Sequence, residues 1–134
     1  MKSEWNSLEA FMAENLQAFR PFAYFDKHLD CIRVKIQDCS VTEVRLSRIF
    51  TVLKPNHGLH ARTGRNVGFT IKGIAHIFDE LGLPVSGVHD LTEILDAIVK
   101  VYPDGAVKRV TEEFSPILKE RKLQVNFEEE KLAA

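Results

Sequence analysis

The segment VRLSRIFTVLKPNHGLHARTGRNVGFTIKGIAHIF, residues 44–78, contains no aspartate and no glutamate. Its basic residues are Arg45, Arg48, Lys54, Arg62, Arg65 and Lys72, which give it a formal charge of +6. Because the whole chain of 134 residues has a formal net charge of −1, the residues outside this segment sum to −7. The positive charge is therefore concentrated in one part of the sequence, and a functional site is best sought there.

Length and composition predict one compact domain over residues 1–134, with a frayed acidic tail from about residue 128. A hydrophobic fraction of 45% and a charged fraction of 28% are typical of soluble globular proteins, and no apolar run is long enough for a transmembrane helix. Glu4 and Glu9 interrupt the N-terminal region where a secretory signal would be apolar. We therefore expect a cytoplasmic protein without membrane contact, in which Cys31 and Cys39 are reduced and buried.

Apolar residues recur at helical spacing in several segments. The first predicted helix runs from about residue 4 to 19, the second follows the capping-box pattern of residues 40–43 and ends before Pro55, and the third runs from Thr70 to a closing glycine at position 82. The fourth begins at the capping-box pattern of residues 90–93. A further amphipathic segment, residues 107–114, precedes a short turn that begins near Pro116.

Apolar and polar residues alternate from Ile32 to Gln37, the pattern of a strand with one buried face. Residues 22–25 are its predicted hairpin partner, and residues 123–127 form a closing strand that we expect to pair with residues 32–36. The expected fold is α+β, with four to five helices packed on a small, mostly antiparallel sheet of two to four strands. A doubly wound parallel sheet is disfavoured because no strand pattern separates the helices predicted between residues 70 and 121.

The predicted ligand site is an anion site in the basic, glycine-containing loop 54–72. Gly64 and Gly68 permit a close backbone approach, and a helix that begins near Thr70 would add free amide groups and the positive end of its dipole. A phosphate group, a small acidic ligand or a nucleic-acid backbone would fit, with Phe69 stacking on a base if it is exposed. The candidate ligand-binding residues are Lys54, His57, His60, Arg62, Arg65 and Lys72.

The loop matches neither a Walker phosphate loop nor a dinucleotide fingerprint, and we expect no cofactor. His57 and His60 have no cysteine or carboxylate close in sequence to complete a metal site. His76 is predicted to be half-buried on a helix. No serine or cysteine lies in a nucleophile motif, so we expect a binding protein rather than an enzyme.

Residues Gly58, Leu59, His60, Ala61 and Arg62 resemble the active-site segment of the histidine-containing phosphocarrier protein of the bacterial sugar phosphotransferase system. The resemblance implies that His60 carries a phosphoryl group and that Arg62 is its electrostatic partner. It covers these five residues of the chain.

Two further alternatives need no ligand. In the first, the loop is a solvated surface segment and Phe69 lies in the core. In the second, the chain is an interaction module that forms a homodimer. In such a dimer the basic segment of one copy would meet an acidic surface of the other. That surface would consist of Asp90, Glu93, Asp96, Glu112 and Glu113.

Overall fold

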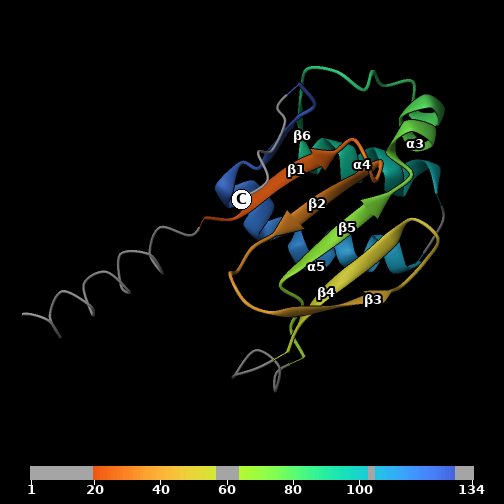
Figure 1. The fold of residues 1–134 in the computed structure, drawn as a ribbon. Coiled ribbons are helices and arrows are strands. Elements are labelled where there is room, and N and C mark those ends of the chain that lie inside the picture. Colours follow the sequence, from red (N-terminus) through yellow and green to blue (C-terminus); the bar gives the residue numbers. More distant parts are fainter. Residues whose placement is uncertain (1–19, 57–63, 103–104, 129–134) are drawn as a thin grey trace, which may run out of the picture.

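The computed structural model describes residues 20–56, 64–102 and 105–128 (Figure 1). Their order in the chain is β1 (Phe22–Asp26), β2 (Cys31–Lys35), β3 (Val41–Arg45), β4 (Phe50–Pro55), β5 (Gly68–Lys72), α3 (Ile74–Leu81), β6 (Val88–Asp90), α4 (Leu91–Val101), α5 (Gly105–Arg121) and β7 (Gln124–Asn126). None of the described helices is long and apolar enough to span a membrane.

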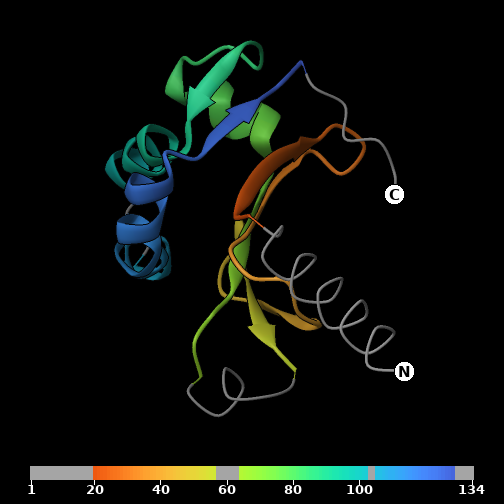
Figure 2. The same cartoon turned by 90° about the vertical axis from the view of Figure 1, so that its left-hand side faces the viewer.

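Five strands form an antiparallel sheet in the order β1-β2-β5-β4-β3. β5 is the central strand and has a hydrogen-bonded neighbour on each side. β6 and β7 form a separate two-stranded antiparallel sheet. Figure 2 shows α4 and α5 on one face of the five-stranded sheet and α3 at the end of the sheet, next to β6.

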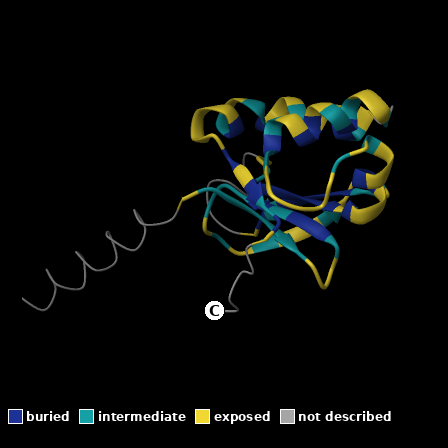
Figure 3. Ribbon diagram, turned by 90° about the horizontal axis from the view of Figure 1, so that it is seen from above, coloured by how far each residue is buried: buried dark blue, intermediate teal, exposed yellow. Residues whose placement is uncertain are grey.

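The core lies between this sheet face and the helices. Alternate residues of the three inner strands point to it and are fully buried: Ile32, Val34, Phe50, Val52, Phe69 and Ile71. The Phe69 ring stacks on Phe50 with a centroid separation of 5.7 Å and tilts against Phe114 of α5 at 4.9 Å. Each helix alternates buried and exposed residues, as Figure 3 shows, so each is covered on one side only.

Gly68 marks a close approach at the start of the central strand. A Cβ atom at this position would lie 2.2 Å from the carbonyl oxygen of Val34 and 2.9 Å from Cδ1 of Leu53. Since the first of these is a backbone atom of the neighbouring strand, the clash cannot be relieved by a side-chain rotation. Glycine is therefore required where β2, β5 and β4 meet.

The expectation of four to five helices is wrong. The described residues contain three helices and a five-stranded sheet, although the α+β class holds. The predicted helix 4–19 lies outside the described residues. Pro116 does not begin a new turn but lies inside α5, on its exposed side, where the unpaired carbonyl of the preceding turn can be hydrated.

The helix expected between residues 43 and 55 is replaced by the β3–β4 hairpin. Leu46, Ile49, Phe50 and Leu53 are spaced as on a helix, but β-branched residues surround them and favour strands. The backbone carbonyl of Ser40, the predicted cap, accepts from the amide of Asn56, 2.9 Å away across the hairpin. Of the polar residues in the capping-box pattern, Ser40 therefore precedes the edge strand β3, and Thr42 and Glu43 lie within it.

The third predicted helix begins four residues later than expected. Thr70 and Ile71 belong to β5, and α3 starts at Ile74 after Gly73, which has a φ of 73°. Ile71 and Ile74 both face the core, so the apolar stripe continues from strand to helix. The predicted end is confirmed, because Gly82 has a φ of 71° and its amide donates to carbonyls of the last turn.

The other predictions have mixed outcomes. The hairpin of residues 22–25 with the strand that follows is confirmed as β1 and β2, with Phe25 opposite Ile32. The helix from residue 91 is confirmed as α4, and the Asp90 carboxylate caps it by accepting from the amide of Thr92 at 2.8 Å. The closing strand exists as β7, but it pairs with β6 rather than with β2.

We predict that Gly68→Ala destabilises the protein by at least about 2 kcal/mol, because the added methyl group overlaps a backbone carbonyl in a packed sheet. Gly105→Ala is the control, since its Cβ would meet nothing within 4 Å and alanine favours the helix that begins there. Chemical denaturation of both variants measures the difference. Equal stability of Gly68→Ala and the wild type would contradict the close packing of the central strand.

Candidate functional site

A cleft of about 580 Å³ opens where the β3–β4 turn, the β5–α3 junction and the C-terminal end of α4 come together. This volume falls within the range of small-molecule sites. Its lining residues are Ser47, Arg48, Ile49, Lys72, Gly73, His76, Ile77 and Tyr102.

The β5–α3 junction is fixed by backbone hydrogen bonds. The amide of Lys72 donates to the carbonyl of Ile49 at 2.7 Å, which ties the junction to the β3–β4 turn. Asp30 holds the start of α3: its carbonyl accepts from the amides of Gly73 and Ile74, and its Oδ1 accepts from the amide of Ala75 at 3.0 Å. Three backbone amides at the start of α3 are therefore already hydrogen-bonded within the chain.

The β3–β4 turn is held by Ser47. Its Oγ accepts from the amides of Ile49 and Phe50, at 3.4 and 3.2 Å, and its carbonyl accepts from Nε of Arg45 at 3.2 Å. Arg48 stands exposed at the tip of this turn. A turn fixed by side-chain hydrogen bonds presents Arg48 to the cleft from a defined backbone position.

Three basic side chains from the acid-free segment line this cleft: Arg48, Lys72 and His76. Neither Arg48 nor Lys72 forms an ion pair with a carboxylate in the part of the chain that the structure describes. The imidazole of His76 is instead paired with a carboxylate of α3. The arrangement suits an anionic group, because two cations that no described carboxylate pairs with face one cavity.

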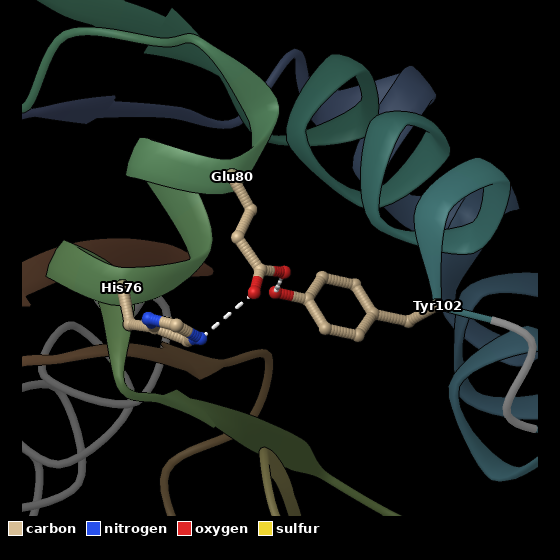
Figure 4. Close-up of polar contacts among 3 residues, drawn as sticks. All are labelled: His76, Glu80 and Tyr102. Carbon is tan, nitrogen blue, oxygen red and sulfur yellow. Dashed lines mark hydrogen bonds and ion pairs between the residues drawn. The ribbon is translucent and has the colours of Figure 1, made fainter.

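Glu80 of α3 places a carboxylate between His76 and Tyr102 (Figure 4). Its Oε1 lies 2.8 Å from Nε2 of His76, and its Oε2 accepts a hydrogen bond from the Tyr102 hydroxyl. This hydrogen bond, partial burial and the nearby negative charge raise the pKa of Tyr102 to about 12. Tyr102 is therefore a neutral donor that joins α4 to α3 across the cleft.

The structure separates the predicted site residues. Lys72 lines the cleft at the C-terminal end of β5, whereas Lys54 and Arg65 lie toward the opposite end of that strand. Nζ of Lys54 donates to Oδ1 of Asn66 at 3.2 Å, and Asn66 donates in turn to Glu113 of α5 at 2.9 Å. His57, His60 and Arg62 lie outside the described residues, so their proposed roles in anion binding and phosphoryl transfer stay predictions.

One supporting argument for the loop site is wrong, and the condition for a second is not met. The helix that was expected to direct free amides toward the loop begins at the other end of β5, and Asp30 binds its first amides. Phe69 is fully buried in the core and cannot stack on a base. The loop therefore loses the contributions expected from the helix dipole and from an exposed aromatic ring.

Sequence reasoning missed Arg48, His76 and Tyr102 as cleft residues. His76 was expected to be half-buried, yet its side chain is 76% exposed. Arg48 and Lys72 lie in the same acid-free segment, so its charge pattern indicated them. The β3–β4 hairpin brings Arg48 and Lys72 to the same cleft. A helix was predicted for residues 43–55, so this arrangement was not.

The two cysteines are free thiols. Cys31 is buried in β2, and burial raises the pKa of its thiol. The described residues contain no group of three His, Cys, Asp or Glu side chains arranged to hold a metal ion.

Comparison of the chain with protein-family models, with curated proteins and with solved structures gives no match.

We predict that Tyr102→Phe removes a pH-dependent part of the stability. The pKa of Tyr102 is about 12 in the folded protein and near 10.0 when the residue is freely solvated, so its stabilising contribution is complete below about pH 10 and is lost as the pH rises toward 12. Thermal unfolding of wild type and variant at pH values below and above 10 measures this contribution. A stability difference that does not shrink above pH 10 would contradict the Tyr102–Glu80 hydrogen bond.

Proposed function

We propose that this chain is a binding protein for a small anionic ligand, and that the ligand lies in the cleft between the β3–β4 turn, the β5–α3 junction and α4. The observation that carries the proposal is the presence of Arg48, Lys72 and His76 on the walls of one cavity of about 580 Å³. A reducing compartment such as the cytoplasm fits the free cysteines Cys31 and Cys39.

The chemistry of the walls favours a ligand with a carboxylate or phosphate group attached to an apolar body. Arg48 and Lys72 supply charged donors for the anionic group. Ile49 and the ring of Tyr102 supply apolar surface for the remainder of the ligand, whereas Ile77 is 1% exposed and adds little. A cleft with both features selects against a bare inorganic ion and in favour of a small organic acid.

The surroundings disfavour nucleic acid as the ligand. A nucleic-acid backbone requires several phosphate contacts along an extended basic surface. Here the cations at the two ends of β5 are separated, Glu80 adds a negative charge beside the cleft, and Glu113 adds one near Lys54 through Asn66. The charge pattern therefore supports a compact ligand at one end of the sheet.

We predict that Arg48→Ala and Lys72→Ala each weaken ligand binding by about tenfold, because each removes one charge-assisted contact. Arg65→Ala is the matched control, since Arg65 is exposed and belongs to the same acid-free segment but lies toward the opposite end of β5. Isothermal titration with inorganic phosphate, succinate, adenosine monophosphate and a single-stranded oligonucleotide, at low and moderate salt, measures the affinities.

The control separates the two candidate sites. If Arg65→Ala weakens binding as much as Lys72→Ala does, the ligand is bound by the loop and the cleft proposal fails. Absence of binding by the wild type for all four probes also contradicts it. Tightest binding to the oligonucleotide, with a steep salt dependence, would replace the small ligand by nucleic acid.

A further inference from the structure

The open edge of the five-stranded sheet is β3. It pairs with β4 on one side and, among the described residues, with no strand on the other. The opposite edge strand, β1, lies close to β7 (Figure 2). Phe25 of β1 packs on Phe127, which follows β7, with a ring separation of 4.8 Å. Thr42, Glu43 and Arg45 of β3 are exposed. An exposed edge strand presents unpaired backbone donors and acceptors to another strand.

The hydrogen bonds of the hairpin show which residues of β3 face outward. Asn56 donates to the carbonyl of Ser40, and Leu46 donates to the carbonyl of Phe50. Because bonding direction alternates along an antiparallel strand, Thr42 and Val44 also bond toward β4. Val41, Glu43 and Arg45 therefore direct their backbone amides and carbonyls toward the open edge. Pro55, which lacks an amide proton, lies opposite Val41, as this alternation requires.

The outward-bonding residues carry complementary charges. Glu43 and Arg45 are two positions apart, so both side chains lie on the same sheet face. In an antiparallel pair of identical strands centred on Val44, Glu43 faces Arg45 of the second strand, and Arg45 faces its Glu43. A twofold axis through Val44 thus creates two opposite-charge pairs from one sequence.

Other registers lack this complementarity. Centring the pair on Glu43 places two glutamates opposite each other, and centring it on Arg45 places two arginines opposite each other. Like charges directly opposite destabilise a strand pair. The alternation of charge therefore selects one register.

We propose that two copies of this chain pair through β3, antiparallel and centred on Val44, so that the sheet continues across both copies. The occupant of the open edge is a second copy because the edge is complementary to itself. The strand is five residues long, and a contact of this size gives a weak dimer that dissociates in the micromolar range or above. None of the outward-bonding residues lines the cleft. The two surfaces are neighbours, because Nε of Arg45 donates to the carbonyl of Ser47 in the turn that forms one cleft wall.

Charge reversal of the full chain tests the proposal. Glu43→Arg and Arg45→Glu each turn both opposite-charge pairs into like-charge pairs, so each variant alone should dimerise at least about tenfold more weakly than the wild type. An equal mixture of the two variants should form a heterodimer, because every contact then joins a glutamate to an arginine. Sedimentation equilibrium at low salt measures all three samples, and thermal unfolding verifies that each variant is folded.

The double variant Glu43→Arg with Arg45→Glu tests the register. It keeps both opposite-charge pairs in the register centred on Val44 and should dimerise as the wild type does. A wild type that stays monomeric at the highest attainable concentration overturns the proposal. Dimers of unchanged strength in the single variants overturn it as well, and would favour contacts through an acidic surface elsewhere on the molecule.

Discussion

The structure depends on hydrogen bonding of β5 on both sides, with Gly68 at the point of closest approach. A side chain at this position would overlap the Val34 carbonyl, so the absence of a Cβ lets β2, β5 and β4 reach their register. Phe69 and Ile71 then project from the same strand into the core, where Phe69 contacts Phe50 and Phe114. One strand thus joins the sheet to the helices that cover it.

The central strand also divides the basic segment in space. Toward its N-terminal end lie Lys54, Asn66 and, through Asn66, the carboxylate of Glu113. At its C-terminal end Lys72 meets Arg48 and His76 around a cleft. The basic residues, which belong to one segment of the sequence, thus form two groups in the structure, and the two groups have different surroundings. This division favours a small ligand at one end over an extended polyanion.

Sequence patterns predicted the elements whose local signals agree with their packing. The β1–β2 hairpin has clear alternation, and α4 has a capping aspartate at position 90 with an apolar stripe behind it. The patterns failed where the spacing of the apolar residues fits both a helix and a strand. Leu46, Ile49, Phe50 and Leu53 match a helix, yet Phe50 packs on one face of the sheet and Leu53 lies on the other. Local spacing cannot reveal which neighbour a strand will have, so the central place of β5 and the partner of β7 were not predictable.

The same limit applies to the candidate site. Charge segregation indicated the correct segment, because a run of basic residues without acids is visible in any sequence. It did not indicate which cations meet, since Arg48 and Lys72 come together through the turn after β3 and the end of β5. Tyr102 is uncharged and lies outside the basic segment, so the charge pattern could not indicate it. It reaches the cleft because α4 ends beside α3, where Glu80 accepts a hydrogen bond from its hydroxyl group.

We propose that the functional end of β5 is the end that leads into α3. Nuclear magnetic resonance of the backbone amides during titration with succinate tests it directly, because each amide reports its own surroundings. We predict chemical-shift changes that cluster at Ile49, at residues 72–77 and at Tyr102. Changes confined to residues 64–68, with the cleft amides unmoved, would contradict it.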